Sequence, residues 1–572
     1  MEKKLSPEIQ SIIDKNRKIN ANNHHCLVRR LRNRSIGRKI PTANFAQNIP
    51  INGSLTKIIV PQNCSPKRFS PCGKYMIALG DHSVELFRFK GSDSVVKTRQ
   101  KFRDEKEKFE GQPPIHDRTR NIRLEHTFSK LRSESFSKAF QHVHTYNLLR
   151  DGNKRIYREF SLFVGRFLLV ASFEQHDMTE GMDLRDFQYS NETIGSPHDA
   201  RSIKHEHYTF HLLDYQDKLR VVSDYFEMRH EFVVLYNNQG VTVHNDNLAI
   251  LGLHQQQIYL FKITPDGRVV KNGQIGAVIY PGDFELLRMH PEYRRDFRET
   301  LGKSPVLTSF KQKLLTFLFK NLPHEKFWSQ FSFLRHLKIW RIHLVDDDTF
   351  LIKLAAEKTI LEAVSPVSNP QLRSQLPSRV ALFVMFEISS GEILGITENI
   401  SESFYKVMID FQHTMEFQSQ PSKYKLLRTC TIHSKSAREK YKAQLEKAKY
   451  GSRAEAIKHI LWQCPPPPQV HTPSPYMRVD LFSFDDTFIS SFYKPRKLPE
   501  SPIRFFCRCC NSQVFALGGD IDPIFFSSHH KNSQVVYIFH PHQPFVISVL
   551  REQNSSEIYN FHFYDPAIPN SN

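Results

Sequence analysis

The sequence lacks the residue patterns that mark most catalytic and metal-binding proteins. Its eight cysteines have no regular spacing, and the tightest group, CRCC at 507–510, has no matching CxxC pair or histidine cluster. We therefore expect no zinc site and reduced thiols, as in intracellular proteins. The chain also lacks a GxxxxGKS/T phosphate loop, a GxGxxG fingerprint after a strand, an HExxH pair and a GxSxG motif. These absences predict no catalytic residues, no cofactor and no bound metal.

Long apolar runs are missing as well. The longest, FSLFVGRFLLVASF at 160–173, contains Arg166 and is too short to cross a bilayer. The N-terminus has no apolar signal core. We therefore expect a soluble protein of the cytosol or nucleus with no membrane partner. Glycine is scarce, with 22 residues among 572, whereas phenylalanine is abundant at 45, which favours a β-rich core.

The clustered aspartates and histidines of the sequence do not indicate a catalytic or metal-binding site. Asp-rich pairs occur at 346–348 and 485–486, and adjacent histidines at 24–25 and 529–530. Aspartate at a turn commonly bonds its own backbone, and adjacent side chains of a strand point to opposite faces. We interpret the acidic groups as turn residues and expect no acid–base catalysis or metal binding here.

The net charge of +20 is concentrated in three segments. Residues 1–50 hold 11 basic and 3 acidic side chains, residues 301–340 hold 7 and 1, and residues 421–460 hold 11 and 3. Their sum of +22 leaves −2 for the rest of the chain. A smooth nucleic-acid groove on the main fold is therefore not indicated, and direct nucleic-acid binding is not expected.

Strand–turn–strand units recur along the chain. In RFSPCGKYMIAL (68–79), Phe69, Pro71, Tyr75 and Ile77 have counterparts at identical spacing in FHPHQPFVISV (539–549). Looser versions, with Asp or Asn at the turn, occur at 244–267, 345–355 and 482–492, and further strand pairs are expected at 161–172 and 381–396. The number and spacing of these units predict a mainly β, degenerate WD-like β-propeller of about seven blades. No Trp-Asp dipeptide occurs, and an unrelated pair of β domains is the alternative.

Helices interrupt these strands. SPVLTSFKQKLLTFLFKNL (304–322) offers Ser304 as a cap and Pro305 at the first helical position, and a second helix is expected at 324–337. Further helices are expected at 401–417 and 436–463, before the prolines at 465–468. Residues 97–140 and 174–206 are expected to be mobile loops, because they mix charges of both signs.

The basic N-terminal tail contains a short amphipathic helix. In NNHHCLVRRLRNRSIGRK (22–39), Leu27 and Leu31 lie four residues apart on one face among six Arg or Lys residues. Docking of this helix into a partner's groove, a nuclear-import signal and a solvated tail all remain open, and the first two are compatible.

Six segments together resemble the De-etiolated family, the plant repressors of light-driven development and their animal counterparts. They are KRFSPCGKYMIAL (67–79), NLAILGLHQQQIYLFKITPDG (247–267), AKYGSRAEAIKHIL (448–461), SPYMRVDLFSFDD (474–486), SPIRFF (501–506) and FHPHQPFVISV (539–549). The resemblance implies a non-catalytic scaffold or substrate-receptor subunit of a nuclear cullin-4 RING ubiquitin ligase, promoting ubiquitination and proteasomal degradation of its targets. It implies four partners: the damaged-DNA-binding adaptor, a small adaptor-associated protein, the constitutively photomorphogenic RING ligase and ubiquitin-conjugating enzymes.

The same resemblance places adaptor binding on residues 24–37, with Leu27, Arg30, Leu31 and Ile36 as contacts. The expected organisation is a docking tail at 1–53, β-propeller at 54–280, a helical insertion at 281–340, β-propeller at 341–400, a second helical insertion at 401–470 and the last blades with ring closure at 471–572. A chromatin- or nucleic-acid-associated regulator without a ligase role is the alternative function, supported by the three basic segments. Nothing in the residues supports an enzyme.

Overall fold

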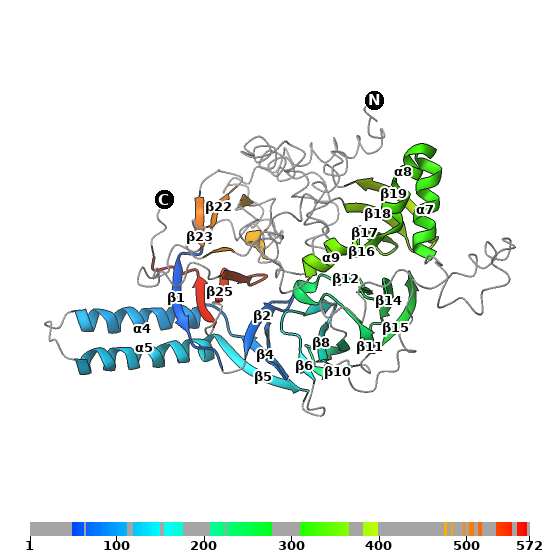
Figure 1. Cartoon of the computed structure of the whole chain (residues 1–572). Helices are drawn as coiled ribbons and strands as arrows, with labels where there is room; N and C mark the ends of the chain where they lie inside the picture. The colour runs from blue at the N-terminus through cyan, green and yellow to red at the C-terminus, as the bar shows by residue number, and fades with distance from the viewer. Residues whose placement is uncertain are drawn as a thin grey trace, which may run out of the picture. The chain divides into compact units, whose positions relative to one another are not determined.

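The computed structural model comprises two compact units, each described by itself below (Figure 1). The first contains Met1–Asn147, Ser422–Ala437 and Val470–Asn572, and the second contains Leu148–Pro421 and Arg438–Gln469. The structure describes residues 49–61, 64–110, 118–148, 154–175, 206–222, 226–276, 309–364, 381–398, 474–477, 482–483, 496–497, 503–507, 513–517, 534–551 and 557–568.

Over these residues the chain is mainly β and forms six antiparallel sheets. The predicted fold class is therefore confirmed at the level of a mainly β protein. The arrangement of the sheets as a ring of about seven blades stays a prediction. Among the described helices, none is both long enough and apolar enough to cross a membrane.

The opening sheet of the first unit contains the strands predicted around the PCG turn. It runs through β2 (Ser65–Phe69), β3 (Tyr75–Leu79), β4 (Ser83–Phe89) and β5 (Phe140–Asn147). Gly73 has φ 72°, and its N–H donates to the Ser70 carbonyl at 2.9 Å. A Cβ there would lie 2.7 Å from the His540 ring, so both conformation and space require glycine. The predicted turn is confirmed.

A second sheet joins the N-terminal and C-terminal ends of the described chain. Its order is β1 (Gly53–Ile58), β26 (Ile558–Phe563), β25 (Phe545–Arg551), β24 (Gln534–Phe539) and β21 (Arg496–Lys497). Gly53 pairs with Phe563 and Leu55 with Phe561. The N-terminal strand β1 thus pairs with the C-terminal strand β26. The described part of this unit also contains a three-stranded sheet of β20 (Phe482–Ser483), β22 (Ile503–Cys507) and β23 (Gln513–Leu517) and a short helix η5 (Pro475–Met477).

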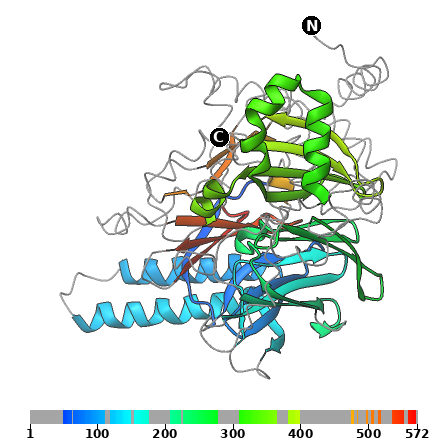
Figure 2. The same cartoon turned by 45° about the vertical axis from the view of Figure 1, so that its right-hand side comes forward.

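The prediction of a mobile loop at 97–140 is wrong. Residues there form two long helices, α4 (Asp93–Glu110) and α5 (Arg118–Ala139), inserted between β4 and β5 and reaching outward from the strands of their own unit (Figures 1 and 2). Phe102 of α4 stacks on Phe128 of α5 with ring centroids 5.3 Å apart. Charges of opposite sign pair at helical spacing, as Arg103 with Glu107 on α4 and Glu134 with Lys138 on α5, so the mixed charges do not indicate disorder.

In its described residues the second unit contains three sheets. The first is built from β6 (Arg155–Ile156), β7 (Leu162–Val164), β8 (Phe167–Gln175), β9 (Glu206–Asp214), β10 (Arg220–Val221) and β11 (Phe226–Glu231). After the short helix η1 (Tyr236–Asn238), the next runs β12 (Val241–His244), β13 (Asn247–Gly252), β14 (Gln257–Ile263) and β15 (Val269–Ile275). The third runs β16 (Leu337–Leu344), β17 (Thr349–Ala356), β18 (Ala381–Glu387) and β19 (Ile393–Glu398).

Two of the predicted helices lie against this third sheet. They are α7 (Ser309–Asn321) and α8 (His324–Arg335), and the short helix α9 (Glu357–Val364) follows β17. Phe310, Leu314 and Leu318 recur at helical spacing and are buried in the core of the β16–β19 sheet. The helix cap predicted at Ser304 and Pro305 lies outside the described residues. The same holds for the helices expected at 401–417 and 436–463 and for nearly all of 174–206.

Candidate docking site

The predicted adaptor contacts Leu27, Arg30, Leu31 and Ile36 lie outside the described residues. The structure instead describes the place where the chain carrying them enters the first unit. Tyr476 donates its hydroxyl proton to the carbonyl of Ile49 at 2.6 Å, and Tyr476 is buried.

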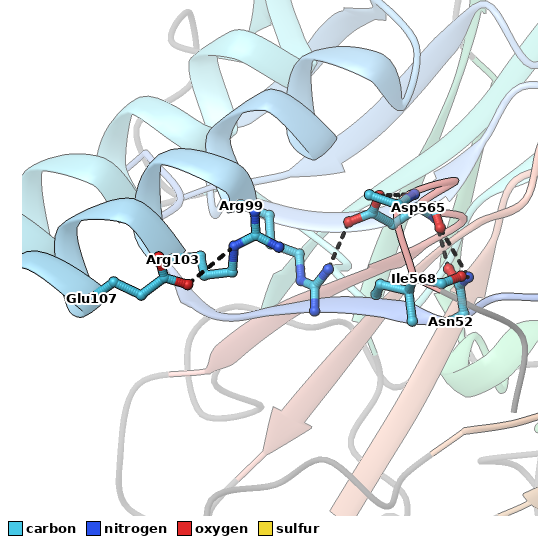
Figure 3. A network of polar contacts seen from close by, with 7 residues as sticks. Asn52, Arg99, Arg103, Glu107, Asp565 and Ile568 are labelled. Atoms are coloured by element: carbon cyan, nitrogen blue, oxygen red, sulfur yellow. Dashed lines mark hydrogen bonds and ion pairs between the residues drawn. The ribbon is translucent and has the colours of Figure 1, made fainter. Parts of the chain in front are cut away.

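Asn52 ties this entry point to the last described residues of the chain (Figure 3). Its side-chain amide donates to the carbonyls of Asp565 at 2.9 Å and Ile568 at 3.2 Å. Its side-chain oxygen accepts the backbone N–H of Asp565 at 2.7 Å. A single amide thus fastens two segments more than 500 residues apart in sequence, next to the β1–β26 pairing.

Asp565 also holds the N-terminal half of α4. Arg99 donates from Nη1 to Oδ2 of Asp565 at 2.6 Å, while Oδ1 accepts the backbone N–H of Ala567 at 3.0 Å (Figure 3). The Asp565 side chain is only 3% exposed, and that of Arg99 is 34% exposed. Because the carboxylate is buried, the ionic hydrogen bond from Arg99 satisfies a charge that would otherwise be costly to keep in the protein.

The arrangement of Asn52, Asp565 and Arg99 has a clear mechanical consequence. Asn52 is bonded to the backbone of Asp565, and Arg99 of α4 is bonded to the buried carboxylate of the same residue. Relative motion of the two would break a charge-assisted hydrogen bond. The geometry therefore holds the chain at Asn52 and the projecting helical pair in a fixed relation.

The two arginines of α4 predict a matched pair of effects. We expect Arg99→Ala to lower the free energy of unfolding by about 1–3 kcal/mol, because it leaves the Asp565 carboxylate buried without its cation. Arg103→Ala removes only the exposed pair with Glu107, whose atoms are 3.6 Å apart, and should cost roughly 0.5 kcal/mol or less. Hydrogen exchange of β26 and the first turns of α4 measures the difference. Equal effects of the two substitutions would contradict the role given to Asp565.

The acidic turn at 346–348 behaves as the sequence predicts. Oδ1 of Asp346 accepts the backbone N–H of Asp348 at 2.9 Å, and Asp348 in turn accepts the Ser389 backbone N–H at 2.8 Å. These carboxylates organise the loops between strands. Within the part of the chain that the structure describes, no group of three His, Cys, Asp or Glu side chains is placed to hold a metal ion. The pairs at 24–25, 485–486 and 529–530 lie outside that part.

One buried carboxyl of the second unit was not anticipated. Glu231, at the end of β11, is 1% exposed, and its Oε1 accepts backbone N–H groups of Phe232, His254 and Gln255 at 3.0, 2.8 and 3.1 Å. Burial raises the pKa of Glu231 to about 7, although these three hydrogen bonds act in the opposite direction. A side chain at Gly252 would collide with this carboxyl group. Glu231 therefore orders the turn between β13 and β14.

Sequence reasoning also missed Asn52, Arg99 and Asp565. Each is a common polar residue with no local motif, and the contacts join positions 466 to 516 residues apart. Only the pairing of β1 with β26 in the folded chain brings Asn52 and Asp565 to neighbouring strand ends.

Comparison with known proteins decides the family. The family model described as De-etiolated protein 1 Det1 matches residues 158–565. The chain belongs to the Det1 family. Light-mediated development protein DET1 of Arabidopsis thaliana is 24% identical over 550 residues, covering 88% of this chain and 92% of the relative. The protein of the same name from Solanum lycopersicum is 24% identical over 379 residues, covering 63% and 69%.

A solved structure of acylaminoacyl peptidase in complex with a chloromethyl ketone also matches, at 11% identity. It covers 51% of this chain and 36% of that chain, with a TM-score of 0.19, too low to carry an argument about fold or activity. Membership of the Det1 family confirms the resemblance inferred from the six sequence segments. The match to the Det1 model begins at Arg158 and ends at Asp565, so it includes Asp565 but neither Asn52 nor Arg99.

Proposed function

We propose that the chain is a non-catalytic scaffold or substrate-receptor subunit of a nuclear cullin-4 RING ubiquitin ligase. In this proposal the helix at 24–37 docks on the damaged-DNA-binding adaptor through Leu27, Arg30, Leu31 and Ile36. Membership of the Det1 family supports the general role. The amphipathic pattern of the tail supports docking, because a helix laid in a groove needs an apolar face with flanking charges.

The observation that carries the proposal is the shared anchor at Asp565. The backbone of Asp565 holds Asn52, and its buried carboxylate holds Arg99 of α4. A subunit that only brings partners together acts through proximity and orientation, which require a rigid connection between its binding elements. The transfer of ubiquitin would then be performed by the partners.

We extend the proposal to the fold and the other partners. The antiparallel sheets would be the blades of a degenerate propeller of about seven blades, closed by β1 on β26. Such a platform offers loops and helical insertions to the small adaptor-associated protein, the constitutively photomorphogenic RING ligase and ubiquitin-conjugating enzymes. Promotion of target ubiquitination and degradation follows from that assembly.

Affinity purification with mass spectrometry tests the assembly. We expect the full-length chain to recover the adaptor together with cullin-4, and Leu27→Asp/Leu31→Asp to lose both, because charge is placed on the apolar face of the docking helix. Leu5→Asp/Ile9→Asp is the matched control, since it makes the same change at another apolar pair four residues apart in the tail. Equal recovery of the adaptor by all three proteins would refute docking through residues 24–37. Retention of DNA or RNA that falls steeply with salt, without the adaptor, would favour the chromatin-associated alternative.

A further inference from the structure

Three turns of the second unit form an acidic surface. They are residues 245–247 between β12 and β13, 346–348 between β16 and β17, and 387–392 between β18 and β19. Together these ranges hold six carboxylates and no basic side chain, in a chain whose net charge is +20. We call this set the acidic turn surface. A group of carboxylates is not by itself a binding site, so the contacts of individual side chains have to show one.

Asp347 connects the two sheets that carry these turns. The Asn245 amide nitrogen donates to both of its carboxylate oxygens, Oδ1 at 2.9 Å and Oδ2 at 3.0 Å, and Asn247 donates to Oδ1 at 3.3 Å. The backbone N–H of Leu344 donates to the Thr242 hydroxyl at 3.1 Å, which fixes the ends of β16 and β12 beside each other. The position of the Asp347 carboxylate relative to the β12–β13 turn is therefore set before a ligand binds.

Asp347 differs from the two aspartates that flank it. Asp346 accepts the backbone N–H of Asp348 at 2.9 Å, and Asp348 accepts that of Ser389 at 2.8 Å, so both carboxylates shape the turns. Among the described residues, Asp347 accepts only the two asparagine amides, and its side chain is 59% exposed. A carboxylate offers about four lone-pair positions, so Asp347 can accept further donors from a ligand.

A buried histidine faces this carboxylate. His244 is the last residue of β12 and is 6% exposed, and its Nε2 lies 3.7 Å from Oδ1 of Asp347. That distance is too long for a hydrogen bond, and no described residue gives Nδ1 a partner either. Buried polar atoms are normally hydrogen-bonded, so an imidazole in this state beside an exposed carboxylate indicates a place for a donor from a ligand. One NH₂ group placed beside both atoms would donate a hydrogen to each.

The charge around Asp347 selects a cationic ligand. Among the described residues, two basic side chains lie next to the surface. Lys262 is opposite Asn247 in the pairing of β13 with β14, and Lys313 donates to the Gly391 carbonyl at 2.7 Å. Six carboxylates and two ammonium groups leave a charge of −4. The surface is therefore complementary to a basic segment.

An arginine fits the donor requirements of this site better than a metal ion. The described residues include no group of three His, Cys, Asp or Glu side chains placed to hold a metal. A planar guanidinium presents paired N–H groups to two acceptors at once. We propose that the acidic turn surface binds an arginine-bearing basic segment of another protein, with one guanidinium donating to Asp347 and to Nε2 of His244. The surface belongs wholly to the second unit, so this proposal does not depend on adaptor docking.

A set of peptides of equal length tests the proposal on the full-length chain. The arginine probe alternates Arg with Gly and Ser and carries a fluorescent label for anisotropy. In the other probes every Arg is replaced by citrulline, which has nearly the same shape without the charge, by Lys or by Glu. We expect the citrulline and glutamate probes to bind at least about tenfold more weakly than the arginine probe, and the lysine probe about threefold more weakly.

Two substitutions test the residues of the site. Asp347→Asn keeps the side-chain shape, removes the charge and should weaken the arginine probe at least about tenfold. His244→Phe keeps a buried ring without nitrogens and should reduce the preference for arginine over lysine. Asp266→Asn is the matched control and should leave binding unchanged. Asp266 and Asp347 are both 59% exposed, but Asp266 already pairs with Arg268 at 3.0 Å. Circular dichroism confirms that each variant is folded.

Four results would overturn the proposal. Equal binding of the arginine and citrulline probes would remove charge as the selecting property. Equal affinities of Asp347→Asn and Asp266→Asn would place the binding elsewhere. Binding that appears only after residues 421–460 are deleted would mean that a basic segment of the chain itself covers the surface. Tight binding of Ca²⁺ or Mn²⁺ that Asp347→Asn abolishes, without binding of the arginine probe, would assign the surface to a metal ion.

Discussion

Phe140→Ala should lower the free energy of unfolding of the first unit by about 3–5 kcal/mol. Phe140 is 2% exposed and starts β5 immediately after α5 ends. Its ring meets five others at centroid distances of 5.1 to 6.1 Å, namely those of Phe69, Phe89, Phe136, Phe545 and Phe561. These rings come from the β2–β5 sheet, from α5 and from the C-terminal strands, so truncation opens a cavity where all of them meet.

Phe128→Ala provides the matched control within the same insertion. Phe128 is half-buried and its ring meets that of Phe102. Its truncation should cost roughly 1 kcal/mol. Urea denaturation followed by circular dichroism measures the loss, and hydrogen exchange of β25 and β26 assigns it to the first unit. Equal destabilisation by the two substitutions, or unchanged exchange in β25 and β26, would contradict this account of the core.

Glu231 should make the second unit less stable as the pH rises from about 4.5 to about 7. Its pKa is raised by burial from the ordinary 4.5 to about 7, so the folded state holds a proton that the unfolded state has lost in this interval. Stability is therefore highest below the unfolded pKa and falls until the folded group also ionises, by about 3 kcal/mol in total. Glu231→Gln should remove this fall, because the amide keeps an oxygen for the three backbone donors and does not ionise.

Urea midpoints at pH 5 and pH 8 measure the effect, with tryptophan fluorescence reporting on the second unit through the buried Trp340. The control is Glu325→Gln, which changes an exposed carboxylate of the same unit and should leave the pH dependence as in the wild type. An identical decrease in wild type and Glu231→Gln would show that the carboxyl is not the group responsible.

The strands were predictable because their signal is local. Alternating apolar residues and turn residues mark β3 and β4 on either side of Gly80–His82, and the same pattern marks β25 and β26. The helices α7 and α8 were predictable from the spacing of Phe310, Leu314 and Phe327. In contrast, α4 and α5 were missed, because their charged exposed faces outweigh a narrow apolar stripe that includes Phe102 and Phe128.

The residues of the candidate site also fall into two groups, those with a local sequence pattern and those that only folding brings together. Leu27 and Leu31 were proposed because an apolar pair among arginines is a local pattern, and the family resemblance pointed to the same segment; their role stays a prediction. Asp565 could not be found, because its importance arises from Asn52 and Arg99, which only the folded chain brings to it. Glu231 was hidden for a related reason: its environment depends on the turn around His254, on a different hairpin.

Direct binding of the purified damaged-DNA-binding adaptor to the purified full-length chain tests the central claim most closely. We predict that Leu27→Asp/Leu31→Asp weakens the affinity by at least about 30-fold, whereas Leu5→Asp/Ile9→Asp leaves it unchanged. The adaptor would then be recognised through the helix at 24–37. An adaptor that binds wild type, variant and control with the same dissociation constant, or that binds none of them, would contradict the account.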